Sequence, residues 1–207
     1  MPRPRSLTES AIAEAALAII DNDGTAQLSM RAVAEALGVG TMSLYRYVRD
    51  RDQLEGLVVD AVLGAAIIPP PSDKPWRERI VVLAERVRHT IRAHPAVVPL
   101  LLTRRHASLA SVRWGEAMLE ALAAAGFAGE ARAVAFRTLL SFLIGSVQVD
   151  YYGPLGGPGT ASLAALPENE FPQLSQTARA ARRLSPERAF REGLSLLLDG
   201  ITQRVGR

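Results

Sequence analysis

Residues 29–48 read SMRAVAEALGVGTMSLYRYV, and this stretch decides the fold. Ser29 is a candidate N-cap for a short helix over 30–37, because its hydroxyl can accept a hydrogen bond from a free backbone N–H of the first turn. The segment Gly38–Gly40 breaks that helix, and a second short helix is expected over 41–47. Two short helices around a glycine-containing turn are typical of a helix-turn-helix.

The side chains of this stretch divide into an inward and an outward group. The apolar positions that can lock the two helices together are Val33, Leu37, Val39, Leu44 and Val48, with small Ala34 at the close approach. The positions left outside on the second helix are Thr41, Met42, Ser43, Tyr45, Arg46 and Tyr47. Hydroxyl, aromatic and cationic groups in one short segment suit the groove of a nucleic acid better than a core.

The rest of the chain shows helical spacing and no alternating strand pattern, so an all-α fold is expected. A capping box at Ser6–Glu9 opens the first helix, and Asp50 with Gln53 forms a variant capping box at the start of the helix over 51–67. The glycine-rich stretch 153–159 is expected to be a loop. The expected helices span about 7–23, 30–37, 41–47, 51–67, 75–93, 96–104, 107–125, 129–152, 170–183 and 186–205.

The prolines at 69–71 mark the clearest linker. They separate an N-terminal domain, with three helices over 1–50 that include the helix-turn-helix and a connecting helix over 51–67, from a second helical domain over 70–207.

Composition removes several classes of function. The 207 residues contain no cysteine, and the three histidines, His89, His94 and His106, have no metal-ligand spacing, so neither a metal nor a cofactor is expected. No paired carboxylates lie beside a nucleophile, which argues against an enzyme. The N-terminus lacks the apolar run of a signal peptide, and no uncharged apolar run is long enough to span a bilayer. A cytoplasmic protein without a membrane partner is expected.

The charge balance limits how the chain could bind DNA. The formal net charge is +3, yet residues 1–60 hold six arginines against nine acidic residues. Non-specific packaging of DNA depends on dense positive charge. Contact with DNA must therefore come from a local patch.

Residues 7–57 resemble the DNA-binding domain of the tetracycline-repressor (TetR) family of bacterial transcription regulators. The shared features are the Ala-x-x-Leu-Gly-Val turn, the Ser-Leu-Tyr core, the second aromatic at Tyr47, and the basic loop within LYRYVRDRDQL at 44–54. The region beyond residue 70 resembles the family's ligand-binding domain in layout and length. The resemblance implies a homodimeric repressor that binds a palindromic operator and releases it when a small molecule binds. The alternative is a helical small-molecule-binding protein or enzyme without a regulatory role.

The resemblance also assigns residues to DNA contact. Arg31 would reach a base edge and Arg51 would grip a phosphate, while the major groove and its flanking phosphates would be met by Thr41, Met42, Ser43, Tyr45, Arg46 and Tyr47. Each assignment has a structural alternative: Arg31 could be a solvated charge, although a cation near a helix N-terminus is unfavourable. Tyr45 and Tyr47 could simply pack.

The ligand pocket is harder to locate. Trp114 and Met118 lie four apart on one helical face, which is compatible with either a core or a pocket. With Phe142 from helix 129–152 and Thr103 as a polar contact, they would form a mostly apolar lining, which predicts a hydrophobic or aromatic effector. Leu100 stands near the position where the founding member of the family has a metal-binding histidine, which argues against a magnesium–tetracycline ligand.

The last helix predicts assembly. Its apolar stripe is Phe190, Leu194, Leu197, Ile201 and Val205, and a neighbouring stripe holds Ala189, Gly193, Leu196 and Gly200. Glycine inside a helix costs about 1 kcal/mol of helix propensity, which makes sense where another helix approaches closely. Helices 129–152 and 186–205 are therefore expected to form a four-helix dimer interface with their symmetry mates.

Overall fold

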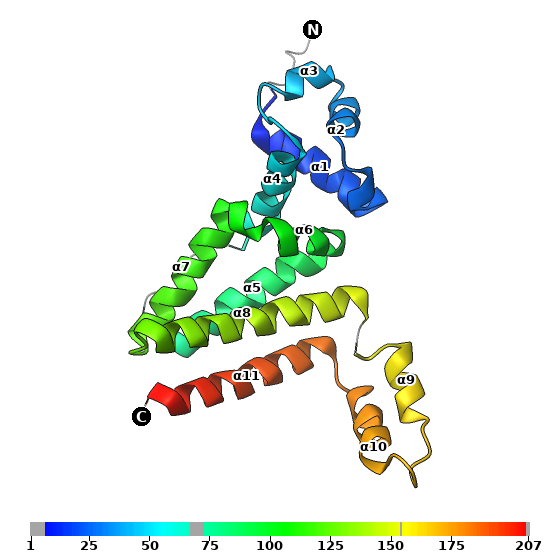
Figure 1. The fold of residues 1–207 in the computed structure, drawn as a ribbon, viewed down its shortest axis with the longest axis vertical. Coiled ribbons are helices and arrows are strands. Elements are labelled where there is room, and N and C mark those ends of the chain that lie inside the picture. Colours follow the sequence, from blue (N-terminus) through cyan, green and yellow to red (C-terminus); the bar gives the residue numbers. More distant parts are fainter. Residues whose placement is uncertain (1–6, 67–72, 154, 206–207) are drawn as a thin grey trace. The chain divides into compact units, whose positions relative to one another are not determined.

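The computed structural model describes residues 7–66, 73–153 and 155–205 (Figure 1). Within those residues every regular element is a helix and no strand occurs, so the expected all-α class is confirmed. The chain divides into two compact units, residues 1–121 and 122–207, which are described separately.

The first unit begins with four helices whose starts are fixed mainly by polar caps. Ser29 and Asp50 each accept a hydrogen bond from the backbone N–H three residues on, as the sequence predicted. Thr8 caps the first helix in the same way, whereas Ser6, the expected cap, lies outside the described residues. The helices, blue to cyan in Figure 1, are α1 (Glu9–Asp23), α2 (Met30–Leu37), α3 (Thr41–Leu44) and α4 (Arg51–Gly64).

The turn between α2 and α3 has the conformation that the glycine predicted. Gly38 has a φ of 66°, in the left-handed region that side chains rarely adopt. Val33, Leu44 and Val48 are fully buried, which locks the two helices as expected, while the remaining two predicted core positions are half-buried.

The second helix of the motif is shorter than the sequence suggested. α3 ends at Leu44 instead of continuing to Tyr47. The backbone N–H of Tyr47 bonds to the carbonyl of Leu44 at 2.8 Å, which is a tighter, 3₁₀-type turn. The end of the segment is therefore coiled more tightly than an α-helix.

Three further helices complete the first unit. They are α5 (Trp76–Ala93), α6 (Val98–Arg104) and α7 (Leu109–Ala124), with 3₁₀ turns η2 (Pro95–Val97) and η3 (Arg105–Ala107) between them. The boundary between the two units falls inside α7. Trp114 on α7 is buried, and its indole N–H donates to the carbonyl of Leu83 on α5 at 3.2 Å. This bond ties α7 to α5.

The second unit holds α8 (Gly129–Tyr152), α9 (Pro158–Ala164), α10 (Pro172–Ala181) and α11 (Pro186–Val205). The sequence-based prediction of a loop over 153–159 is wrong at its end, because α9 begins at Pro158. Proline suits the first turn of a helix, where its missing N–H would have had no partner. The start of α11 at Pro186 follows the same rule and was predicted.

The arrangement of α8 and α11 explains one glycine. A Cβ on Gly193 of α11 would come within 3.1 Å of the Phe142 ring on α8, so the glycine allows the two helices to pack within this chain. The Phe142 and Phe190 rings also meet, with centroids 5.5 Å apart. The chain buries only one stripe of α8: Ala135, Leu139, Leu143 and Val147.

Candidate nucleic-acid interface

The helix-turn-helix presents a polar and aromatic surface. Of the six predicted contact residues on the second helix and its turn, none is buried. Met42 is 79% exposed, and Tyr45 and Arg46 are also exposed, while Thr41, Ser43 and Tyr47 are half-buried. The short segment therefore carries a methionine, two tyrosines, a threonine, a serine and an arginine, all of them exposed or half-buried.

Arg31 lies at the start of α2 and is almost fully exposed. Its Nε donates to Glu35 Oε1 at 2.8 Å, one turn further along the helix. This hydrogen bond and the charge of Glu35 raise the pKa of Arg31 above its usual value. An exposed pair of this kind is worth little stability.

Arg51 is held more firmly. Its Nε donates to Glu55 Oε1 at 2.8 Å, and its Nη2 donates to the carbonyl of Thr25 at 3.0 Å. The side chain is still 52% exposed. A guanidinium has five N–H donors, so these two bonds fix its position and leave three donors.

The structure adds residues that the sequence analysis missed. Arg104, at the end of α6, donates from Nε to Glu55 Oε2 at 2.8 Å and also pairs with Asp52. The hydrogen bond that Arg104 donates to Glu55 is the main cause that raises the pKa of Arg104. An i, i+4 spacing could have revealed the pair Arg51–Glu55, but nothing local links α6 to α4 across 49 residues.

A second polar contact fixes α4 further along. Asp60 Oδ1 accepts hydrogen bonds from Ser108 Oγ at 2.6 Å and from the backbone N–H of Ala110 at 2.9 Å. Ser108 Oγ in turn accepts from the N–H of Ser111, at the start of α7. α4 is therefore attached at two places, to the end of α6 through Arg104 and to the segment before α7 through Ser108.

Another pair joins α1 to the helices that follow. His94 Nδ1 lies 2.7 Å from Asp21 Oδ2, between the end of α5 and the last turn of α1. Among the described residues no three His, Asp or Glu side chains gather as a metal site.

The four predicted ligand residues are divided between the two units. Trp114 and Met118 are buried together on α7 in the first unit, whereas Phe142 belongs to the second unit. Thr103 is exposed, and its hydroxyl donates to the carbonyls of Pro99 and Leu100 of its own helix. The ligand-site prediction stays a prediction.

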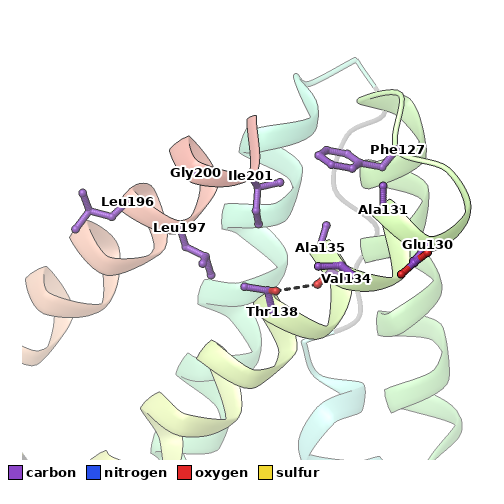
Figure 2. Close-up of a pocket in the computed structure, with 10 residues that line it drawn as sticks. All are labelled: Phe127, Glu130, Ala131, Val134, Ala135, Thr138, Leu196, Leu197, Gly200 and Ile201. Carbon is purple, nitrogen blue, oxygen red and sulfur yellow. Dashed lines mark hydrogen bonds between the residues drawn. The ribbon is translucent and has the colours of Figure 1, made fainter. Parts of the chain in front are cut away.

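The second unit has an open apolar groove of about 690 Å³ between α8 and α11 (Figure 2). Val134 on α8 and Leu196 on α11 border it and are 46% and 73% exposed. Its lining residues are Phe127, Glu130, Ala131, Val134, Ala135, Thr138, Leu196, Leu197, Gly200 and Ile201. Among the described residues, α8 is long and apolar enough to cross a membrane, judged by length and composition alone. The core helix of a soluble protein meets the same criterion.

Comparison with known sequences decides the family. The profile described as "Bacterial regulatory proteins, tetR family" matches residues 12–54, and "Tetracyclin repressor-like, C-terminal domain" matches residues 68–205. The chain belongs to the tetR family of bacterial regulatory proteins. Its members are helix-turn-helix transcriptional regulators that bind DNA operators and are not enzymes, so the alternative of a helical enzyme is wrong.

Two curated relatives match only part of the chain. An HTH-type transcriptional regulator of Saccharopolyspora erythraea is 35% identical over 144 residues, 70% of this chain and 61% of that protein. The HTH-type transcriptional repressor DrrR1 of Streptomyces coeruleorubidus is 41% identical over 95 residues, 45% of this chain and 35% of the relative. The chain thus spans less than two thirds of either relative.

Solved structures match over the full length. Apo ActR from Streptomyces coelicolor superposes with a TM-score of 0.84 at 28% identity, covering 100% of this chain and 99% of ActR. ActR in complex with actinorhodin gives a TM-score of 0.81 at 28% identity, covering 97% and 99%. This tetR-family chain therefore shares its fold with ActR, a relative that has been solved both without a ligand and in complex with actinorhodin.

Proposed function

We propose that this tetR-family chain is a cytoplasmic, ligand-responsive repressor that binds a palindromic operator as a homodimer and is released by a small hydrophobic effector. The observation that carries the proposal is the exposed α2–α3 surface, held on a buried core by the left-handed Gly38 turn. A relative over part of the chain is a repressor, and ActR binds actinorhodin.

In this proposal each residue of the surface has a role. Arg31 reaches a base edge, and Arg51 grips a phosphate. The contacts to the major groove and flanking phosphates come from Thr41, Met42, Ser43, Tyr45, Arg46 and Tyr47. The exposure of Met42, Tyr45 and Arg46 is compatible with this role, since these side chains are available to a partner.

The dimer is proposed to form through α8 and α11. The open groove between them and the exposed Leu196 are apolar surface that a second copy would cover. The surface of α11 at Gly200 is also not covered by other residues of this chain, since a Cβ there would meet nothing within 4 Å. Burial of this face against its symmetry mate also explains why α8 is so apolar, with no need for a membrane.

The effector is proposed to bind among the helices after Trp76 and to tilt α4 as a lever. Thr103, Trp114, Met118 and Phe142 remain the proposed lining. An effector can release DNA only if it prefers a conformation in which the two recognition helices are wrongly spaced. A coupling of about 1–3 kcal/mol would weaken operator binding about 5- to 150-fold.

The test begins with duplexes selected by the protein from a randomised pool. We expect a palindromic consensus, bound far more tightly than a random duplex at about 0.15 M salt. Polycyclic aromatic compounds are then screened for release of the selected duplex. Selection of no duplex would overturn the regulatory proposal and leave a small-molecule-binding protein as the remaining alternative.

A further inference from the structure

Glu55 is a buried carboxylate shared by two arginines. The residue is only 5% exposed, and each of its oxygens accepts one hydrogen bond: Oε1 from Arg51 and Oε2 from Arg104, both at 2.8 Å. Arg51 begins α4, whereas Arg104 ends α6. Arg104 also pairs with Asp52, so one guanidinium from α6 meets two carboxylates of α4, Asp52 in its first turn and Glu55 one turn further along.

The charges of this cluster balance only while Arg104 is present. Two carboxylates, Asp52 and Glu55, face two guanidinium groups. Without Arg104, the cluster carries an excess negative charge at the start of α4, and Arg51 is its only cation. A buried carboxylate strongly requires a charged partner. Arg51 would therefore be committed to Glu55.

We propose that Arg104 is a positioning residue for DNA binding, which acts through Glu55 to leave the Arg51 guanidinium available to a DNA phosphate. The inference rests on the proposed function, because it assumes that Arg51 contacts the DNA backbone. Its geometric basis is the half-exposed Arg51, which is oriented by Glu55 and by the carbonyl of Thr25 and retains three N–H donors.

The same contact gives α6 control over the strength of DNA binding. A shift of α6 that withdraws Arg104 would change the local charge at α4 even if the recognition helices kept their spacing. Asp60, which holds the start of α7, would keep α4 attached during such a shift. The effect is therefore electrostatic and is separable from tilting of α4.

The test is the salt dependence of binding to a duplex selected by the wild-type protein. Each phosphate contact contributes about 0.9 to the slope of log K against log salt. Arg104→Gln should remove one contact per protomer, which makes the slope of a dimer shallower by about 2. Between 50 and 200 mM salt, the wild-type protein should then lose about tenfold more affinity than the variant.

Three comparisons separate this role from a merely structural one. Arg51→Gln should give the same slope as Arg104→Gln, and the double variant should show no further change. Glu55→Gln should restore the wild-type slope in Arg104→Gln, because the neutral amide releases Arg51, but it should not restore Arg51→Gln. Arg113→Gln, an exposed arginine on α7, is the matched charge control and should keep the wild-type slope.

The outcomes are distinct. Three results would overturn the inference while DNA binding itself stands. The first is a wild-type slope in folded Arg104→Gln, and the second is a failure of Glu55→Gln to restore the wild-type slope in Arg104→Gln. The third is an equal change of slope in Arg113→Gln. If Arg104→Gln does not fold, the comparison is made in the Glu55→Gln background, where an added Arg104→Gln that changes the slope overturns the inference and an unchanged slope supports it. A wild-type protein that selects no duplex overturns the proposed function, and this inference with it.

Discussion

Replacing Leu196 by glutamate tests the proposed dimer most directly. Full burial of a leucine side chain is worth about 1.5–3 kcal/mol. Because Leu196 is 73% exposed in the isolated chain, covering it would contribute about 1–2 kcal/mol per copy, and two-fold symmetry doubles this to about 2–4 kcal/mol. Leu196→Glu should therefore raise the dimer Kd at least about 30- to 1,000-fold, and the buried carboxylates raise it further.

The assay is sedimentation velocity over a concentration series, combined with circular dichroism. The variant should sediment as a monomer at concentrations where the wild-type protein is a dimer, and it should keep its helical signal because the substituted side chain already lies in solvent. Leu109→Glu, at a 55% exposed leucine of α7, is the matched control and should remain dimeric. A Leu196→Glu dimer as tight as that of the wild-type protein would refute the interface.

Three further changes test the base contact, the core and the α4 attachment. Arg31→Ala should weaken binding to the selected duplex by about 1–3 kcal/mol and leave random-duplex binding nearly unchanged in a fluorescence-anisotropy titration; equal losses would mean that Arg31 touches only phosphate. Trp114→Ala should lower the urea-unfolding free energy by about 3–5 kcal/mol, whereas Trp114→Phe, which loses mainly the bond to Leu83, should cost about 1 kcal/mol; an unchanged midpoint for both would contradict the core assignment. Asp60→Ala should lower the same free energy by about 1–2 kcal/mol through loss of its bonds to Ser108 and the start of α7, and no loss would show that this attachment is dispensable.

Local rules predicted the motif well. Caps such as Ser29 and Asp50 depend on side chains that reach only three residues along the chain, so their position in the sequence is enough to identify them. Gly38 was identifiable because the backbone needs a left-handed residue there. The errors also have local causes: the glycines around Pro158 concealed α9, and the 3₁₀ turn after Leu44 shortened α3.

The residues that attach α4 to the rest of the first unit could not be found in this way. Arg104 and Glu55 are 49 residues apart, and Ser108 and Asp60 are 48 apart, so each contact depends on how α6 and α7 fold back onto α4. Only the three-dimensional structure distinguishes the buried Glu55 from the other acidic residues among the first 60 positions. Part of the excess negative charge of that segment therefore has a structural role: exposed Asp52 and buried Glu55 on α4 both pair with Arg104 from α6. In the proposed mechanism, withdrawal of the single Arg104 guanidinium changes the charge beside Arg51 without altering the helix-turn-helix itself.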